Sequence, residues 1–245
     1  MKRLIALSLL LAPAACVDNR SSIEIDGRAA PTDLTTCKFA PGGDILSGAG
    51  LLDVGVSEPT YNLEVYVKND LSNPSTASTP VIGQIPTVIS STKAWTANAA
   101  KVRVNPSGYV DTFGPNPSLL QFNGENVTPL DGQTIQPGGG TAVQLVEAIS
   151  GPLGAQLTSL VAPGDLRRIV LGISLQGRTL DGASLDTSEW YFPLDLCNGC
   201  LTCPAGQVPS SAGCVACPTG QVPTAQSCFG FGQDSAAICA TPIAQ

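Results

Sequence analysis

Apolar and polar residues alternate with a period of two over much of the segment from residue 37 to 196. The alternation is clearest in three stretches: 63–67 (LEVYV), 169–175 (IVLGISL) and 190–196 (WYFPLDL). A period of two places every second side chain on the same face of a β-strand. These segments therefore predict half-buried strands, not helices.

The last two stretches are joined by residues 177–187, which contain the turn dipeptide Asp181-Gly182 and predict a hairpin. We expect a short helical turn at 153–161, ended by Pro163-Gly164. Shorter stretches with the same alternation give further strand candidates at 52–56, 87–90, 101–105, 118–122 and 141–147.

Roughly seven to nine short strands without a strand-helix-strand rhythm predict two antiparallel sheets packed face to face. The expected fold class is all-β, an antiparallel immunoglobulin-like β-sandwich followed by a small disulfide-rich module. The likeness is to the architecture, because the Cys-Trp-Cys spacing of antibody domains is absent. Trp95 and Trp190 are expected in the core, with a sugar-binding platform as the alternative.

Composition supports short strands and turns, since Gly (26) and Pro (20) are abundant and charged residues make up only 13%. Without Lys2 and Arg3 of the leader described below, ten basic residues face nineteen acidic ones, a formal charge of −9. Such a surface repels phosphate backbones and anionic lipid. We therefore expect no nucleic-acid partner.

The chain contains no histidine. Ser-His-Asp and Cys-His catalysis, histidine-ligated zinc and an imidazole general base are therefore excluded. Ser90 to Lys93 matches Ser-x-x-Lys, but the Ser-Asp-Asn and Lys-Thr-Gly motifs of penicillin-recognising enzymes do not follow. We expect a non-enzymatic protein with no catalytic residue, cofactor or metal.

Three acidic residues near the predicted hairpin, Asp181, Asp186 and Glu189, offer a weaker candidate for calcium. Their spacing is not that of an EF-hand, and carboxylates in turns are usually solvated. We therefore expect no calcium site there.

Residues 1–15 have the organisation of a secretory signal peptide. Lys2 and Arg3 precede the apolar run 4–12, which is too short to span a bilayer, and small residues follow it. The sequence thus predicts export.

The run 12–16, Ala-Pro-Ala-Ala-Cys, resembles the lipobox of bacterial lipoproteins. The resemblance implies that Cys16 becomes the new N-terminus and carries fatty acyl chains such as palmitate. Lipidation of Cys16 also leaves eight of the nine cysteines, an even number that can all pair. The alternative is ordinary cleavage that releases a soluble protein starting at Ala15.

In lipoproteins an Asp directly after the lipidated cysteine favours retention in the inner membrane, whereas here that position is Val17. The resemblance therefore implies anchoring in the outer membrane. Residues 16–36 are expected to form the lipidated cysteine and a flexible tether. The alternative is that Ile23 and Ile25 add an edge strand to the sandwich, whose predicted bounds are 37–196.

Residues 197–245 form a cysteine-rich module with two fourteen-residue repeats, one starting at Cys203 and one at Cys217. They resemble the small cysteine-rich repeats of extracellular proteins. With few large apolar side chains the module needs covalent cross-links, and an oxidising compartment favours disulfides. The disulfide candidates are Cys37, Cys197, Cys200, Cys203, Cys214, Cys217, Cys228 and Cys239.

Eight cysteines allow 105 connectivities. We expect Cys37 to pair with Cys197 or Cys200, which would close nearly the whole sandwich and hold the tether and the tail at the same pole. Two other chemistries remain open for the tail. One is a four-thiolate zinc site, and the other is an iron–sulfur cluster. The zinc site would use Cys200, Cys203, Cys214 and Cys217, and the cluster would begin at Cys197, Cys200 and Cys203.

These features together predict a membrane-anchored lipoprotein of the cell envelope that acts as a non-enzymatic binding, adhesion or structural module. Its expected partners are the membrane, through the lipid, and an unidentified protein or glycan. The alternative function is a redox or metal-binding protein that uses the C-terminal cysteines.

Overall fold

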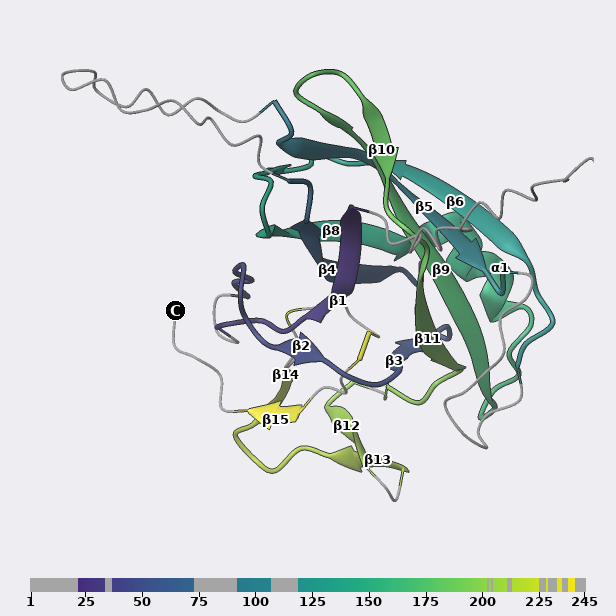
Figure 1. The fold of residues 1–245 in the computed structure, drawn as a ribbon. Helices are drawn as coiled ribbons and strands as arrows, with labels where there is room; N and C mark the ends of the chain where they lie inside the picture. The colour runs from purple at the N-terminus through teal and green to yellow at the C-terminus, as the bar shows by residue number, and fades with distance from the viewer. Residues whose placement is uncertain are drawn as a thin grey trace, which may run out of the picture.

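The computed structural model describes residues 22–33, 37–72, 92–106, 119–201 and most of 203–240 (Figure 1). In this last segment the undescribed residues are 204, 211–212, 225–227, 229–232 and 235–237. The leader, Cys16, Ser90 and the strand expected at 87–90 lie outside the described residues. Strands account for nearly all of the regular secondary structure in the described residues, as the alternation predicted.

The first sheet has four antiparallel strands. Its central strands are β1 (Ile23–Ala29) and β4 (Tyr61–Asn69), and its edges are β2 (Ile45–Leu46) and β8 (Gly140–Ile149). The pattern of apolar residues in β4 and β8 explains the pairing, because Leu63 lies opposite Val146 and both are fully buried.

The second sheet has seven strands, with β9 (Leu166–Thr179) at its centre. The strand β11 (Trp190–Cys197) pairs with one edge of β9, and β5 (Trp95–Val104) pairs with the other. The remaining strands are β3 (Gly50–Asp53) beside β11, β6 (Gly124–Pro129) and β7 (Thr134–Ile135) beside β5, and β10 (Ser184–Asp186) beside β9.

One pair departs from the expected antiparallel arrangement. The chain leaves β2 at the edge of the first sheet and enters β3 at the edge of the second, where β3 runs parallel to β11. Leu51 lies opposite Asp195 in this parallel ladder. The expectation of purely antiparallel sheets is wrong for this pair. β3 arrives by a crossover from the other sheet and not through a hairpin with β11, so no tight turn forces the two strands to be antiparallel.

The apolar faces of both sheets share one core. Ile169, Leu171, Ile173 and Leu175 of β9 are fully buried, as the period of two predicted. The expected hairpin is present, with β10 folded back on β9 through a turn at Gly182. The helix α1 (Gly151–Thr158) also contributes the buried Leu153 and Leu157 to this core.

The two tryptophans belong to the core region and not to an exposed platform. Trp95 is fully buried, and its indole Nε1 donates a hydrogen bond to the Leu185 carbonyl oxygen at 3.0 Å. A Cβ on Gly177 would lie 2.3 Å from the indole ring, so only glycine lets β9 pass this side chain. Trp190 is partly buried and stacks on Phe192, with ring centroids 5.5 Å apart.

The expected tether is corrected for residues 23–29, which form β1. Ile23 and Ile25 are buried, and the strand lies between β2 and β4 instead of at an edge. Ile23 and Ile25 point to the same face of the chain, and pairing with the apolar strand β4 buries both, so this otherwise polar stretch forms a strand.

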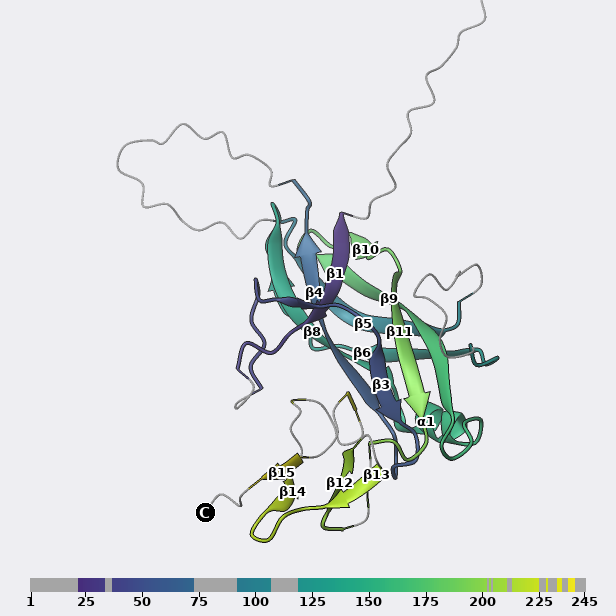
Figure 2. The same ribbon diagram turned by 90° about the horizontal axis from the view of Figure 1, so that it is seen from below.

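The cysteine-rich tail forms two small two-stranded sheets beyond one end of the larger sheets (Figure 2). One pairs β12 (Gln207–Ser210) with β13 (Gly213–Ala216), and the other pairs β14 (Val222–Thr224) with β15 (Ile238–Ala240). No helix among the described residues is long and apolar enough to cross a membrane.

Candidate functional site

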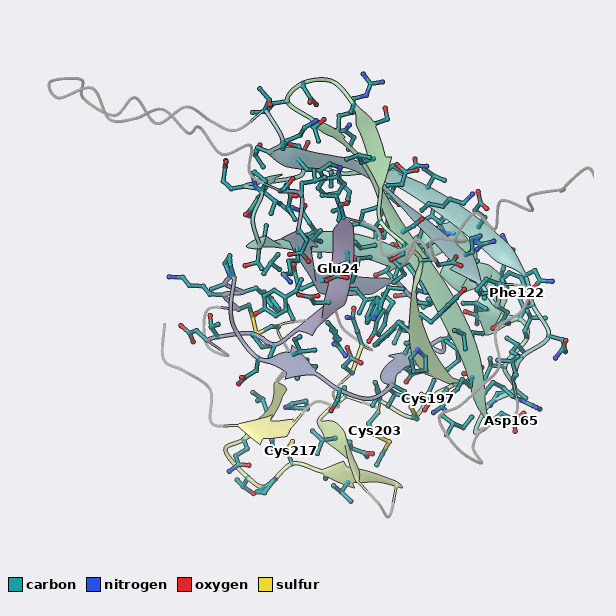
Figure 3. The ribbon with its side chains drawn as sticks, viewed as in Figure 1. Glu24, Phe122, Asp165, Cys197, Cys203 and Cys217 are labelled. Atoms are coloured by element: carbon teal, nitrogen blue, oxygen red, sulfur yellow. A yellow bond between two sulfur atoms is a disulfide. The ribbon has the colours of Figure 1, made fainter. Side chains whose placement is uncertain are left out.

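The eight cysteines that follow Cys16 all form disulfides. The pairs are Cys37–Cys228, Cys197–Cys200, Cys203–Cys214 and Cys217–Cys239. Figure 3 shows Cys203 and Cys217 in the tail and Cys197 where β11 leaves the sheets. The structure thus brings every one of the eight candidate residues into a pair, whereas Cys16 lies outside the described residues and its lipidation stays a prediction.

The expected partner of Cys37 was wrong. Cys37 pairs with Cys228, in the second repeat, while Cys197 and Cys200 pair with each other. Cys197 ends β11, and the backbone turns back within two residues, so its nearest sulfur is that of Cys200. The resulting Cys37–Cys228 bond joins positions 191 residues apart and encloses most of the β-domain.

The two repeats also differ in their pairing. Cys203 bonds Cys214 within the first repeat, around the hairpin of β12 and β13. In the second repeat Cys217 instead bonds Cys239, and Cys228 bonds Cys37. The equal spacing of the repeats therefore does not fix equal connectivity.

These bonds leave no free thiolate for the zinc site or the iron–sulfur cluster considered above. The four expected zinc ligands are divided among three disulfides. Because metals bind thiolates and not disulfide sulfur, the oxidised tail does not offer either ligand set.

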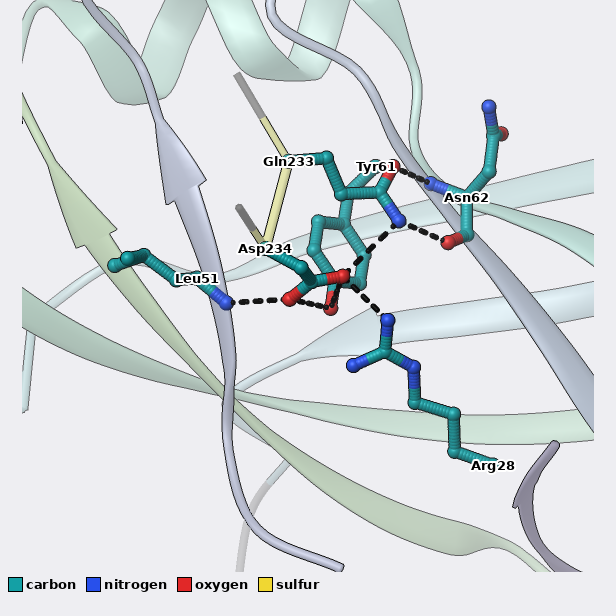
Figure 4. Close-up of polar contacts among 6 residues, drawn as sticks. All are labelled: Arg28, Leu51, Tyr61, Asn62, Gln233 and Asp234. Carbon is teal, nitrogen blue, oxygen red and sulfur yellow. Dashed lines mark hydrogen bonds and ion pairs between the residues drawn. The ribbon is translucent and has the colours of Figure 1, made fainter. Parts of the chain in front are cut away.

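A buried polar network joins the tail to the larger sheets (Figure 4). The Asp234 carboxylate accepts hydrogen bonds from the Tyr61 hydroxyl at 2.8 and 2.9 Å and from the Leu51 backbone N–H at 2.9 Å. It also forms an ion pair with Arg28. The Asp234 N–H in turn donates to the Leu51 carbonyl oxygen at 2.7 Å. One aspartate of the tail thus contacts β1, β3 and β4.

The preceding residue extends this junction. Gln233 is fully buried, and its side-chain amide accepts from the Asn62 N–H at 2.9 Å and donates to the Asn62 carbonyl oxygen at 2.5 Å. Its backbone forms an isolated antiparallel bridge with Leu52. Gln233 therefore satisfies both backbone polar groups of Asn62, near the start of β4.

The electrostatics of the junction favour a neutral phenol beside an ion pair. The Arg28 and Asp234 side chains are only 7% and 14% exposed. Burial, and then the negative charge of Asp234, raise the pKa of Tyr61, so its hydroxyl acts as a hydrogen-bond donor. The Arg28 guanidinium also lies 5.9 Å from the centre of the Tyr61 ring.

A second polar junction surrounds Asp53, the fully buried last residue of β3. Its carboxylate accepts from the backbone N–H groups of Gly55 at 2.9 Å, Gly199 at 2.7 Å and Leu201 at 2.8 Å. Asp53 therefore orders the first turn of the tail, which contains the Cys197–Cys200 bond.

That junction is also the one group of three potential metal ligands found among the described residues. A carboxylate oxygen of Asp53 and the sulfurs of Cys197 and Cys200 lie within 4.8 Å of one another. The two sulfurs are bonded to each other, so the group in its oxidised form holds a disulfide beside a buried carboxylate.

A cleft of about 350 Å³ lies where β6 and β8 form neighbouring edges of the two sheets. The side chain of Gln144 lines it and is 4% exposed. Its amide nitrogen finds no hydrogen-bond partner among the residues that the structure describes. Two carboxylates, Asp131 and Glu147, also line the cleft. The site could therefore accept a polar ligand with acceptor and donor groups.

The acidic residues near the hairpin do not gather into a calcium site. Asp181 binds Lys93 at 2.6 Å, and Glu189 forms an ion pair with Arg103. The Lys93 contact lowers the pKa of Asp181 to about 2. Lys93, the lysine of the Ser-x-x-Lys match, therefore forms an ion pair with Asp181.

Sequence reasoning missed the residues of both junctions. Arg28 lies in the expected tether, and Gln233 and Asp234 lie in a polar part of the tail. The sequence signal that could have indicated a buried polar junction is Asp53, a charged residue between the apolar Leu52 and Val54.

No protein-family model, curated protein or solved structure matches this chain.

Proposed function

We propose that the protein is an exported bacterial lipoprotein, anchored through Cys16, that displays a cross-linked β-domain as a non-enzymatic binding, adhesion or structural module. One observation carries the proposal. The eight cysteines that follow Cys16 are all used in four disulfides, which leaves Cys16 as the single cysteine outside them. Its position at the end of the leader matches the acylated residue of a lipobox.

The expected immunoglobulin-like topology belongs to this proposal, and the strand order supports it. In such folds strands A, B and E lie in one sheet, and strands C, C′, F and G lie in the other. Here β1, β4 and β8 lie in one sheet, and β5, β6, β9 and β11 lie in the other, in the same chain order. Many cell-surface domains share this sandwich architecture, which agrees with a binding or structural role.

On this proposal the tail points away from the membrane. Ile23 begins β1 beside Asn69, whereas Arg28, near the other end of β1, contacts the tail. Residues 17–22 would span at most about 20 Å, which keeps the domain close to the lipid surface. The cysteine-rich module would then be the outermost part. A bond from Cys37 to Cys197 or Cys200 had instead placed the tether and the tail at the same pole.

The proposal assigns the protein to the outer membrane, on the basis of Val17 after the lipidated cysteine. It leaves the cleft between β6 and β8 as the candidate site for a protein or glycan ligand. The polar lining of that cleft supports a binding role, because a buried amide donor and two carboxylates can recognise a polar partner.

Membrane fractionation of cells that express the chain tests the anchor. The wild-type protein is expected in the membrane fraction, extractable only with detergent, and Cys16→Ala is expected to lose that attachment. The double variant Cys197→Ala with Cys200→Ala is the control, because it removes cysteines that are not expected to be acylated and opens only the shortest disulfide loop, so it should leave the chain in the membrane fraction. Equal distribution of wild type and Cys16→Ala would refute the lipid anchor.

A further inference from the structure

The Cys197–Cys200 disulfide differs from the other three in how little of the chain it encloses. Only Asn198 and Gly199 separate its cysteines, and a shorter loop contributes less to stability in the chain-entropy model. Cys197 is held independently, because it pairs with Asp53 and Leu166 in neighbouring strands. This bond can therefore open without release of the fold.

The two cysteines of this bond are unequally exposed. Cys197 is 2% exposed at the end of β11, whereas Cys200 is an exposed residue on the following turn. A thiolate from another molecule can thus approach the bond more readily from the side of Cys200 than from that of Cys197. This arrangement selects which sulfur is attacked and which one leaves.

A buried carboxylate lies beside both sulfurs. An oxygen of Asp53 is within 4.8 Å of each, and the residue itself is fully buried. Asp53 also accepts from the N–H groups of Gly199 and Leu201, which flank Cys200. If the bond opens, the Cys197 sulfur stays next to a buried carboxylate whose hydrogen bonds hold the turn that carries Cys200.

We propose that Cys197–Cys200 is a thiol–disulfide exchange site for exported polypeptides that carry two free thiols, with Asp53 as its positioning residue. The proposal does not depend on the lipid anchor, because it concerns the folded domain. It also differs from a purely structural role of the tail, which requires all four disulfides to stay closed.

The exchange proceeds in two steps. A client thiolate attacks the Cys200 sulfur, a bond between client and Cys200 forms, and the Cys197–Cys200 bond breaks. The electron pair stays on the Cys197 sulfur, which takes up a proton. The second client thiolate then attacks the client sulfur, and Cys200 leaves as a thiolate. The client loses two electrons and gains a disulfide, and the protein gains two thiols.

Exchange with a reduced dithiol peptide tests the site on the full folded chain. Samples quenched with an alkylating agent and mapped by mass spectrometry report each disulfide separately. We expect Cys197–Cys200 to open at least tenfold faster than the other three bonds, with the circular dichroism spectrum unchanged. Equal rates for all four bonds, or opening only on unfolding, would overturn the proposal.

Two matched variants test the unequal sulfurs, since both lack the same disulfide. Cys197→Ser leaves the exposed Cys200 thiol, and Cys200→Ser leaves the buried Cys197 thiol. We expect glutathione disulfide to modify Cys197→Ser at least tenfold faster than Cys200→Ser. Similar rates in the two variants would contradict selective attack at Cys200.

The role of Asp53 is tested in the Cys200→Ser background. A negative charge near the Cys197 sulfur disfavours its thiolate, so Asp53→Asn should move the pH midpoint of Cys197 alkylation downward. The exposed Asp70→Asn is the control and should leave the midpoint in place. An unchanged midpoint in a folded Asp53→Asn variant would remove Asp53 from the exchange. If that variant does not fold, the peptide and glutathione experiments still decide the main proposal.

Discussion

The Tyr61 hydroxyl lies 2.8 Å from one oxygen of the Asp234 carboxylate and 2.9 Å from the other, although 173 residues separate the two positions. Tyr61 is a fully buried core residue of β4, and Asp234 belongs to the cysteine-rich tail. The tail is therefore joined to the β-domain by buried polar contacts as well as by the Cys37–Cys228 bond.

Removal of the Asp234 charge is predicted to be strongly destabilising. In Asp234→Asn the buried Arg28 guanidinium loses its counter-charge, which typically costs about 3–5 kcal/mol of unfolding free energy. Urea denaturation followed by fluorescence measures the change. Asp70→Asn, which breaks the exposed pair with Lys68, is the control and should have a much smaller effect. Equal effects of the two variants would show that the junction does not stabilise the fold.

Tyr61→Phe removes only the hydroxyl of the same junction. The carboxylate of Asp234 loses a buried donor, so we expect a loss of about 1–3 kcal/mol in unfolding free energy. Tyr191→Phe is the matched control, because its hydroxyl is exposed and contacts Glu189. A Tyr61→Phe variant as stable as the wild type would contradict the assigned hydrogen bonds.

The raised pKa of Tyr61 predicts that the stability of the fold depends on pH in the alkaline range. Burial raises the pKa of Tyr61 in the folded state above the unfolded value of about 10. The unfolded chain therefore loses this proton first, so the contribution of Tyr61 is complete below pH 10 and declines as the pH rises above it. Urea denaturation between pH 8 and about 11 should show a steeper loss for wild type than for Tyr61→Phe. Parallel curves would contradict the assignment.

The four disulfides are predicted to contribute unequally. By the chain-entropy model the Cys37–Cys228 bond stabilises by about 5 kcal/mol and the Cys197–Cys200 bond by about 2 kcal/mol. The double variants Cys37→Ser with Cys228→Ser and Cys197→Ser with Cys200→Ser should therefore differ clearly in melting temperature. The reverse order would show that loop length does not govern their contributions here.

A substitution in the cleft between β6 and β8 is predicted to increase the stability of the fold. The buried amide nitrogen of Gln144 has no protein partner among the described residues, so Gln144→Leu should raise the unfolding free energy by about 1 kcal/mol. Gln156→Leu, on the exposed side of α1, is the control and should change it little. A loss of stability in Gln144→Leu would mean that its amide is satisfied in solution.

The sequence predicted those strands whose apolar residues alternate over several positions. β9 and β11 were located because Ile169 to Leu175 and Trp190 to Leu196 each place several apolar side chains on one face. β6 was missed, since Glu125, Asn126 and Thr128 give it little apolar character at the sheet edge. A strand was expected instead at 118–122, where the described residues form only an isolated bridge at Leu119.

The junction could not be predicted for a different reason. Its contacts depend on where the tail folds back, and Arg28 and Asp234 look like ordinary surface charges in the sequence. The even number of cysteines after Cys16 indicated that all eight would pair. It could not indicate the partner of Cys37, because an even count says nothing about connectivity. Local pattern therefore predicted the sheets, and long-range packing determined the junction.

The intact mass of the protein extracted from membranes decides whether the chain is both acylated and oxidised, because one spectrum reports the two modifications together. We expect a chain that starts at Cys16, carries acyl chains there, and is eight hydrogens lighter than its fully reduced form, as four disulfides require. A chain with its leader uncut, without acyl mass and with reduced thiols would refute the lipid anchor and the disulfides together.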